Sequence, residues 1–310
     1  MLCQRITGAT TACVWLAFGL TACTPEEKER VLSGDAKIAT AADVENLAQY
    51  TAITGRLTVK RAALKEIVLP RLKTVGGKLY VQKNADLRSL RLPALGSIGS
   101  EDGDVAIIER NPVLTEVDLG GLKTAAYQIS VRNNDALRRV NLGALTEIVG
   151  TGLEIADNPA LQEISVPGLL VAASVSITEC GSLRRVVLSD LKNTGALVVE
   201  GNDQLEILDA RGLERVAAIP DSAVPVCRLS IVGNGSLKAL DGLKSLAGAS
   251  PTCAIDVRDN GELPTCDVDG LLQRIKKAGW PGVPALCGNK IDACGGGKCP
   301  GGEGRPDAGP

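Results

Sequence analysis

The sequence predicts a mainly-β parallel solenoid of about nine coils with short helical caps at its N- and C-terminal ends. A phrase of aliphatic residues, Leu79-x-Val81-x-x-Asn84-x-x-Leu87 in one coil, returns nine times at intervals of 22 to 32 residues. Its second aliphatic residue falls at Val59, Val81, Ile108, Val131, Ile155, Ile177, Val199, Ile231 and Val257. Repeats of this length are typical of solenoids, in which each coil stacks only on its neighbours.

Each coil is predicted to contain two short strands. In the second coil, Leu79 and Val81 alternate with other residues, and Leu90 and Leu92 do so again. Alternation with a period of two indicates a strand with one buried face, and neither run is long enough for a helix. Stacked coils would place equivalent strands about 4.8 Å apart in two parallel sheets, with the aliphatic side chains between them.

Asparagine fills the same place in seven of the nine coils, and Ala62 and Cys180 fill it in the other two. A coil must bend there, and an inward amide can satisfy backbone groups at the bend and the asparagine of the next coil. We therefore interpret the column as a structural ladder rather than a polar binding row. Its members are Asn84, Asn111, Asn134, Asn158, Asn202, Asn234 and Asn260.

The ends of the chain suggest export. Arg5 precedes a short apolar stretch at 11–22, which is typical of a signal peptide and too short to span a bilayer. The stretch ends in Leu20-Thr21-Ala22-Cys23, which resembles a bacterial lipobox. The resemblance implies cleavage after residue 22 and acylation of Cys23, with a plain secretory signal as the alternative. The residue after the cysteine is Thr24. An Asp at this position would favour retention in the inner membrane, so we expect the outer membrane, without a preference for its periplasmic or its surface face.

We expect four segments in order: a signal peptide at 1–22, a tether at 23–39, the solenoid with its caps at 40–287, and a Gly- and Pro-rich tail containing cysteine at 288–310. Thr40 can cap a short helix before the first coil. Residues 267–278 carry Leu271, Leu272 and Ile275 at helical spacing and are expected to form the C-terminal cap.

Two cysteines lie at equivalent places in adjacent coils. Cys227 and Cys253 each precede the first aliphatic residue of a coil by two positions, which predicts Cα atoms about 5 Å apart and a disulfide in an exported protein. Cys180 is expected to be free and buried.

The remaining cysteines belong to the C-terminal cap and tail. Cys266–Cys287 is the expected cap disulfide, Cys266–Cys294 is the alternative, and Cys294–Cys299 is a candidate pair in the tail. A metal site at Cys287, Cys294 and Cys299 is the competing interpretation. Zinc sites usually contain Cys-x-x-Cys units or histidine, and neither is present, so we expect no metal.

The composition narrows the possible functions. The formal charge is −2, histidine is absent, and no polybasic segment suggests nucleic acid. No phosphate loop, nucleophile elbow or histidine-containing triad appears, and no cofactor is expected. Carboxylates are abundant, so the composition leaves open the paired-acid chemistry of polysaccharide-active enzymes, some of which are β-helices.

Four predicted surface residues alternate in charge just before the second strand of consecutive coils: Glu116, Arg139, Glu163 and Arg185. They could form a ladder of exposed ion pairs or a stripe that docks a partner. Insertions at 99–104, 217–227 and 247–253 all fall at the turn that enters the first strand, where they could form either a ligand-facing rim or tolerated surface loops.

The strings Ile53-Thr-Gly-Arg-Leu-Thr-Val59 and Leu69-Pro-Arg-Leu72-Lys-Thr-Val75-Gly-Gly-Lys-Leu79-Tyr-Val81 resemble the receptor L-domain. The resemblance covers about 40–265. It implies a right-handed β-helix related to leucine-rich repeats, like those in the extracellular halves of receptor kinases. It implies no particular binding residue, because those receptors bind through variable surface positions.

These observations lead us to expect a non-enzymatic, lipid-anchored envelope protein with a binding or adhesion solenoid. Its partners would be the membrane, through the lipid, and an unidentified envelope or surface protein or polymer. The alternatives are a polysaccharide-active enzyme anchored in the outer membrane and a purely structural spacer.

Overall fold

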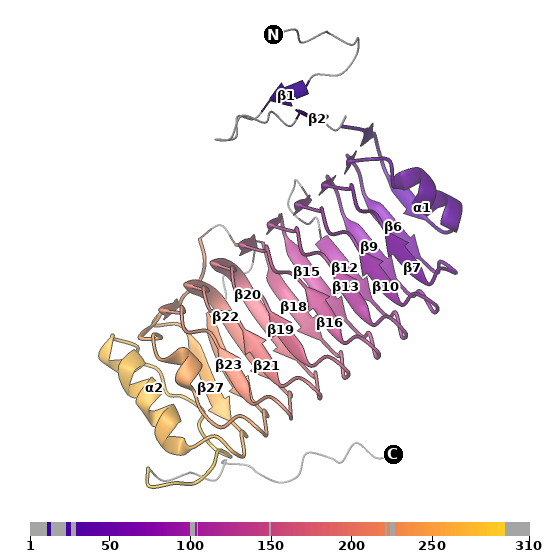
Figure 1. Ribbon diagram of the computed structural model, residues 1–310. Helices are drawn as coiled ribbons and strands as arrows, with labels where there is room; N and C mark the ends of the chain where they lie inside the picture. The colour runs from indigo at the N-terminus through magenta and orange to yellow at the C-terminus, as the bar shows by residue number, and fades with distance from the viewer. Residues whose placement is uncertain are drawn as a thin grey trace.

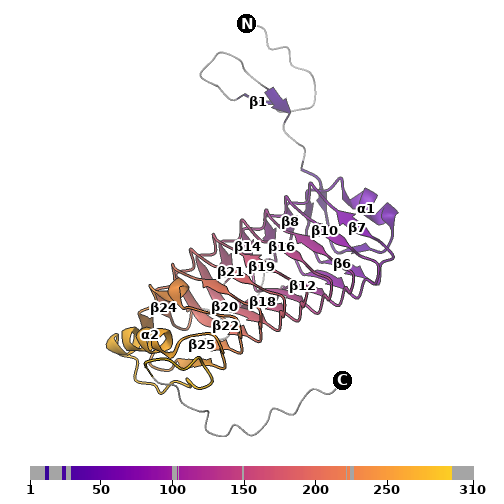
Figure 2. The same cartoon turned by 60° about the horizontal axis from the view of Figure 1, so that its bottom comes forward.

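The strands stack into an elongated parallel β-solenoid of about ten coils (Figures 1 and 2). This computed structural model describes residues 11–13, 23–25, 29–99, 103, 105–148, 150–220, 222–223 and 227–294. Among the described residues, no helix is both long enough and apolar enough to cross a membrane.

One face of the solenoid is built from the long strands, which follow one another in parallel without a break. Val59, Val81, Ile108 and Val131 are lateral neighbours, as the repeat predicts, and the register continues to Val257. The long strands are β4 (Ala36–Ile38), β6 (Leu57–Lys60), β9 (Leu79–Gln82), β12 (Val105–Glu109), β15 (Gln128–Arg132), β18 (Gly152–Ala156), β20 (Val171–Thr178), β22 (Asn193–Glu200), β25 (Arg228–Val232) and β27 (Ala254–Arg258).

The second face is built from three-residue strands, each holding one inward aliphatic residue such as Leu90 or Val117. These strands form two separate sheets, one of four strands and one of three. The members are β7 (Glu66–Val68), β10 (Ser89–Arg91), β13 (Glu116–Asp118), β16 (Arg139–Asn141), β19 (Glu163–Ser165), β21 (Arg185–Val187) and β23 (Ile207–Asp209).

A third set of strands corrects the prediction of two strands per coil. Each of these strands has two residues, and together with the long strands they make up one sheet of 18 strands. A two-residue strand contributes a single inward side chain, for example Val75 or Ile98, so it leaves no alternation in the sequence. The members are β3 (Val31–Leu32), β5 (Ala52–Ile53), β8 (Thr74–Val75), β11 (Ser97–Ile98), β14 (Thr124–Ala125), β17 (Glu147–Ile148), β24 (Arg215–Val216) and β26 (Gly248–Ala249).

The solenoid begins earlier than the predicted boundary at residue 40. Strands β3 and β4 lie within the expected tether, yet β4 pairs with β6 and places Ile38 beside Val59. Helix α1 (Ala41–Leu47) therefore follows the first long strand. As predicted, Thr40 caps the helix: its hydroxyl accepts from the Asp43 N–H, and the Asp43 carboxylate accepts from the Thr40 N–H at 2.8 Å. Strands β1 (Thr11–Cys13) and β2 (Cys23–Pro25) pair only with each other among the described strands.

The C-terminal end is closed by helix α2 (Thr265–Lys277). A short 3₁₀ helix, η1 (Asp241–Leu243), lies earlier in the chain, before β26 and β27. Leu271, Leu272 and Ile275 are buried on the last coils, as their spacing predicts. Each large aliphatic side chain removed from water contributes about 1.5–3 kcal/mol. Because the chain has one Phe, this aliphatic column supplies nearly all of its core. Trp280 closes the end, with its indole N–H donating to the Cys253 carbonyl at 3.0 Å.

Candidate functional site

The asparagine column lies inside the solenoid. Asn111 Oδ1 accepts from the backbone N–H of Asn84 at 3.1 Å and from its Nδ2 at 2.9 Å. Asn111 Nδ2 in turn donates to the Val81 carbonyl at 3.1 Å. All seven predicted asparagines are fully buried, so the column holds the coils together and offers nothing to a ligand.

The ladder extends further than predicted and is interrupted once. Asn289, in the expected tail, accepts from the N–H and Nδ2 of Asn260 and so adds an eighth member. Cys180 interrupts the column; it is free and fully buried, as expected. Burial raises the pKa of its thiol to about 11, although hydrogen bonds from Asn158 oppose the shift.

The residue before each ladder position turns the chain through a left-handed backbone conformation. Gly201, Gly233 and Gly288 take this position at φ near 65–72°, where glycine is unstrained. Other coils place ordinary residues there, including Arg61 and Lys83 at φ 53° and 57°. The bend fixes the corner between the two faces, so the side chains of the second face project outward in register.

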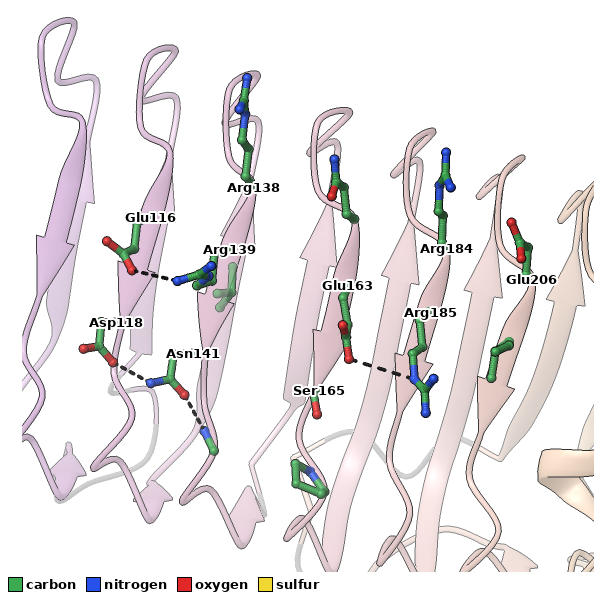
Figure 3. A pocket seen from close by; sticks show the side chains of 15 residues that line it. Glu116, Asp118, Arg138, Arg139, Asn141, Glu163, Ser165, Arg184, Arg185 and Glu206 are labelled. Carbon is green, nitrogen blue, oxygen red and sulfur yellow. Dashed lines mark hydrogen bonds and ion pairs between the residues drawn. The ribbon is translucent and has the colours of Figure 1, made fainter.

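The predicted stripe of alternating charge lines a groove on the second face. The groove has a volume of about 750 Å³ and runs over β13, β16, β19, β21 and β23 (Figure 3). Four arginines line it, in two adjacent pairs on coils separated by one coil: Arg138 with Arg139, and Arg184 with Arg185. Two coil spacings place these pairs about 10 Å apart.

The predicted ladder of ion pairs is divided into two. Arg139 Nη1 lies 3.7 Å from Glu116, and Arg185 Nε lies 3.9 Å from Glu163. Between Arg139 and Glu163 no ion pair forms, so the four residues make two separate pairs. Arg138 and Arg184 form no ion pair with any described residue, so two of the four guanidiniums are available to a ligand.

The ladder divides because the sheet beneath it is interrupted. Strands β16 and β19 are sequential neighbours on this face, but they share no strand pairing. In regular coils the Arg138 N–H donates to Thr115 O at 3.0 Å, and the Arg184 N–H to Gln162 O at 2.9 Å. The equivalent bond from the Gln162 N–H to Arg138 O is missing among the described residues.

The other end of the same two strands is open as well. The Leu119 N–H donates to Asn141 O at 3.0 Å, and the Val166 N–H to Val187 O at 2.9 Å, but the Leu142 N–H does not reach Ser165 O. We call this interruption between β16 and β19 the seam. Figure 3 shows the two strands on either side of it, with Arg139 and Asn141 on one and Glu163 and Ser165 on the other. Between its two arginine pairs, the groove therefore has peptide groups that lack a hydrogen-bond partner in the described part of the chain.

The groove also gathers four carboxylates: Glu116, Asp118, Glu163 and Glu206. Glu116 and Glu163 are in ion pairs, and Asp118 accepts from Asn141 Nδ2 at 2.7 Å and from the Gly120 N–H at 3.0 Å. Among the described lining residues, only the Glu206 carboxylate has neither a hydrogen bond nor an ion pair.

The predicted rim lies elsewhere. The described parts of the three insertions connect two-residue strands to long strands, at β11–β12, β24–β25 and β26–β27. None of their described residues lines the groove. The seam could not be predicted from the sequence, because the loss of backbone hydrogen bonds between two coils does not change the pattern of side chains in the repeat.

The disulfides agree in part with expectation. Cys227 and Cys253 are bonded, with Cα atoms 4.5 Å apart. Cys266 is bonded to Cys294, the alternative pairing, which rules out both Cys266–Cys287 and Cys294–Cys299. Cys287 is itself in a disulfide, and Cys299 lies outside the described residues.

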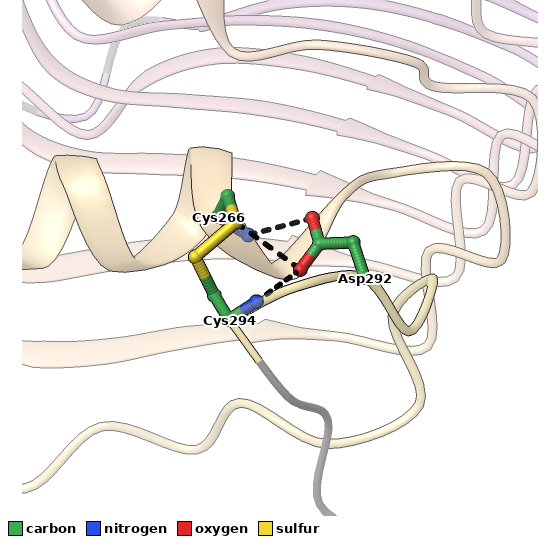
Figure 4. Close-up of side chains that lie close together, drawn as sticks. All are labelled: Cys266, Asp292 and Cys294. Carbon is green, nitrogen blue, oxygen red and sulfur yellow. Dashed lines mark hydrogen bonds between the residues drawn. A yellow bond between two sulfur atoms is a disulfide. The ribbon is translucent and has the colours of Figure 1, made fainter.

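The Asp292 carboxylate lies beside the Cys266–Cys294 bond and accepts from the N–H groups of Cys266 and Cys294, each at 3.0 Å (Figure 4). The Cys266 contact is the main cause of the lowered pKa of Asp292. The close approach of these three residues therefore reflects a stapled loop, with both sulfurs engaged in the disulfide.

The position expected to carry lipid, Cys23, begins β2, and the rest of the lipobox lies outside the described residues. Comparison with protein-family models and with curated proteins finds no match for this chain. The receptor L-domain thus remains a resemblance of sequence strings, and what is established is a parallel β-solenoid of about ten coils.

Proposed function

We propose that this protein is a non-enzymatic binding module of the cell envelope, exported and anchored by a lipid at Cys23. Its groove over the seam would contact a protein or a cell-surface polymer. The observation that supports this most is the groove itself, in which an interrupted sheet and two arginines without an ion pair to any described residue meet on one exposed face. Arginine is enriched where protein partners bind most strongly, and unpaired peptide groups can accept new hydrogen bonds.

A capture experiment tests the groove. The Arg138→Ala/Arg184→Ala variant removes two guanidiniums that make no ion pair with described residues, so it should fold normally. Immobilised wild-type protein should retain a partner from envelope extracts, and the variant should retain at least about tenfold less, as loss of binding hot spots implies. Lys73→Ala/Lys123→Ala is the matched control, because both lysines are exposed and lie outside the groove. Equal retention by all three proteins would refute the groove, and no retention by any would favour the spacer.

The anchor is tested separately. Cys23→Ser should abolish acylation, detected by mass spectrometry of the N-terminal peptide, and should move the protein out of the membrane fraction. An unmodified Cys23 in the wild-type protein would refute the anchor and leave the groove proposal unaffected.

One observation favours the second candidate, a polysaccharide-active enzyme: four carboxylates and four arginines share one open groove. Paired-acid hydrolysis needs two carboxyl groups that face the sugar, whereas three of these four are engaged with protein groups. We expect no new reducing ends when the protein is incubated with neutral and acidic polysaccharides. Turnover that disappears in Glu206→Gln would establish the enzyme instead.

A further inference from the structure

A second charged surface lies on the edge that joins the two faces. In each coil this edge runs from the last residue of the long strand to the residue before the second strand. We call its first three segments, 60–65, 82–88 and 109–115, the basic edge. It carries six cations: Lys60, Arg61, Lys65, Lys83, Arg88 and Arg110.

The basic edge has little negative charge of its own. Its acids are Asp86 and Glu109, and Glu109 is 6% exposed and held by Arg132, whose Nη2 lies 2.8 Å away. On the neighbouring helix α1, Asp43 is occupied by the N-cap, which leaves Glu45. All the cations except Arg110 are free of ion pairs with described residues, and Arg110 lies 4.0 Å from Glu109.

The charge of this edge reverses along the molecule. From residue 156 onward, the equivalent segments carry Asp157, Glu179, Glu200, Asp203, Glu206, Asp259 and Glu262 against three cations. The whole chain follows the same trend: residues 29–146 contain 17 Lys and Arg against 13 Asp and Glu, whereas residues 147–294 contain 13 against 19. The molecule is therefore an elongated electrical dipole with its positive end at the N-terminal coils.

Three of these cations occupy a position that strains the backbone. Arg61, Lys83 and Arg110 have φ of 53–57°, in the left-handed region that Gly201 and Gly233 occupy in later coils without strain. Later coils place Asn133, Asp157, Glu179 and Asp259 at the same position with the same backbone conformation. The charge at this position therefore changes from positive to negative along the molecule while the turn itself is kept.

The basic edge lies at the end of the solenoid nearest to Cys23, which indicates the kind of surface that it would contact. Seven residues separate Cys23 from Val31, where the solenoid begins, and the eight Cα–Cα steps between them span at most about 28 Å. With the lipid anchor of the proposed function in place, the basic coils would stay close to the membrane. Clusters of four to eight Lys and Arg beside a membrane are attracted to anionic headgroups. We propose that the basic edge docks on an anionic lipid surface and that the acidic end projects away from it.

The test uses the lipid-free 24–310 fragment, so that docking is measured without the anchor. The deletion removes β1, which pairs only with β2, and leaves the solenoid strands intact. The fragment should sediment with phosphatidylcholine vesicles that contain phosphatidylglycerol and should stay in solution with pure phosphatidylcholine. Binding should weaken steeply as salt is raised from 50 to 200 mM, in proportion to the charges engaged.

Charge-reversal variants distinguish the effect of the basic edge on vesicle binding from the effect of the net charge of the protein. Lys60→Glu/Lys83→Glu/Arg88→Glu should weaken vesicle binding at least about tenfold. The matched control, Lys238→Glu/Lys276→Glu/Lys277→Glu, changes the net charge equally at the far end and should bind as the wild type does. Thermal melts check that both variants fold. Equal weakening by the two variants, or no binding to anionic vesicles, would overturn the proposal. Because acylation of Cys23 is measured independently, failure of the anchor and failure of the docking surface are distinguishable.

Discussion

At the residue scale, each asparagine of the ladder satisfies groups in two coils at once. Asn111 accepts from the N–H and Nδ2 of Asn84 and donates to the Val81 carbonyl in the preceding coil, and its Nδ2 also donates to Asn134 Oδ1 in the following coil. All of these asparagines are fully buried. Replacement by a shorter side chain therefore leaves several buried polar groups unpaired, so the ladder contributes more than one ordinary hydrogen bond per coil.

Asn111→Ala should lower the free energy of unfolding by about 3 kcal/mol or more, because each orphaned buried group costs about 1–3 kcal/mol. Urea unfolding measures the loss. Asn133→Gly is the matched control: Asn133 directly precedes the ladder residue Asn134, but its side chain makes none of the ladder hydrogen bonds. At its φ of 54° glycine is unstrained, so the change should stay within about 1 kcal/mol. Similar losses in both variants would contradict the structural role of the ladder.

Cys180 is the weak point of the ladder. Asn158 meets a sulfur there, whereas elsewhere an amide oxygen accepts the same pair of donors. Cys180→Asn should therefore stabilise the protein by about 1 kcal/mol, the net worth of a better hydrogen bond. Thermal unfolding compared with Cys180→Ala provides the check. A Cys180→Asn protein less stable than the alanine variant would show that the site cannot accept an amide.

The Cys180 thiol also predicts a dependence on pH. Its pKa is about 11 in the folded protein, above the value of about 8.5 for an unfolded thiol, so the folded state holds the proton more tightly. This contribution is complete below the unfolded pKa and is lost as pH rises toward 11. The free energy of unfolding should fall over that range in the wild type and fall less in Cys180→Ala. Identical profiles would contradict the burial of the thiol.

At the scale of elements, the sequence predicts those strands and helices whose inward side chains repeat with a regular period. Alternation located the long strands and their register, and helical spacing located α2, because inward aliphatic residues repeat in both. The two-residue strands were missed, since one inward residue such as Ile98 makes no pattern. Strands β3 and β4 were assigned to the tether, because three residues of β4 are too few to show a period.

The groove was predicted only in part. Its charged residues, Glu116, Arg139, Glu163 and Arg185, were found from their place in the repeat. The seam beneath them is a property of backbone hydrogen bonds, which the side chains do not encode. The sequence likewise does not distinguish Arg138 and Arg184, which form no ion pair with a described residue, from Arg139 and Arg185, which do. The choice between Cys287 and Cys294 for Cys266 likewise depended on how the loop after α2 folds back.

The Cys266–Cys294 disulfide ties this loop to α2. It closes a sequence separation of 28 residues, worth about 3–4 kcal/mol in the chain-entropy estimate. The Cys266→Ala/Cys294→Ala variant should therefore increase amide exchange in α2 and residues 285–292 while the central strands keep their protection. Unchanged exchange in α2 would show that apolar packing alone holds the cap. Uniform loss across the solenoid would show that the cap and coils unfold together.

At the scale of the whole molecule, the coils form a continuous column on one face and a divided one on the other. The long strands pair from β4 to β27, so the stack is joined throughout, while the second face separates between β16 and β19. The sheet opening thus coincides with the groove and the two arginine pairs. The positive N-terminal coils lie toward the tether, and the acidic coils lie at the other end.

Residue-resolved amide hydrogen exchange of the full chain tests this arrangement most directly. The Gln162 N–H, which has no acceptor across the seam, should exchange orders of magnitude faster than the Arg184 N–H, which donates to Gln162 O at 2.9 Å in the same column. Leu142 should likewise exchange faster than Leu119. Equal protection within each pair would mean that β16 and β19 are bonded, that the sheet is continuous, and that the groove proposed as the binding site does not have the open floor described.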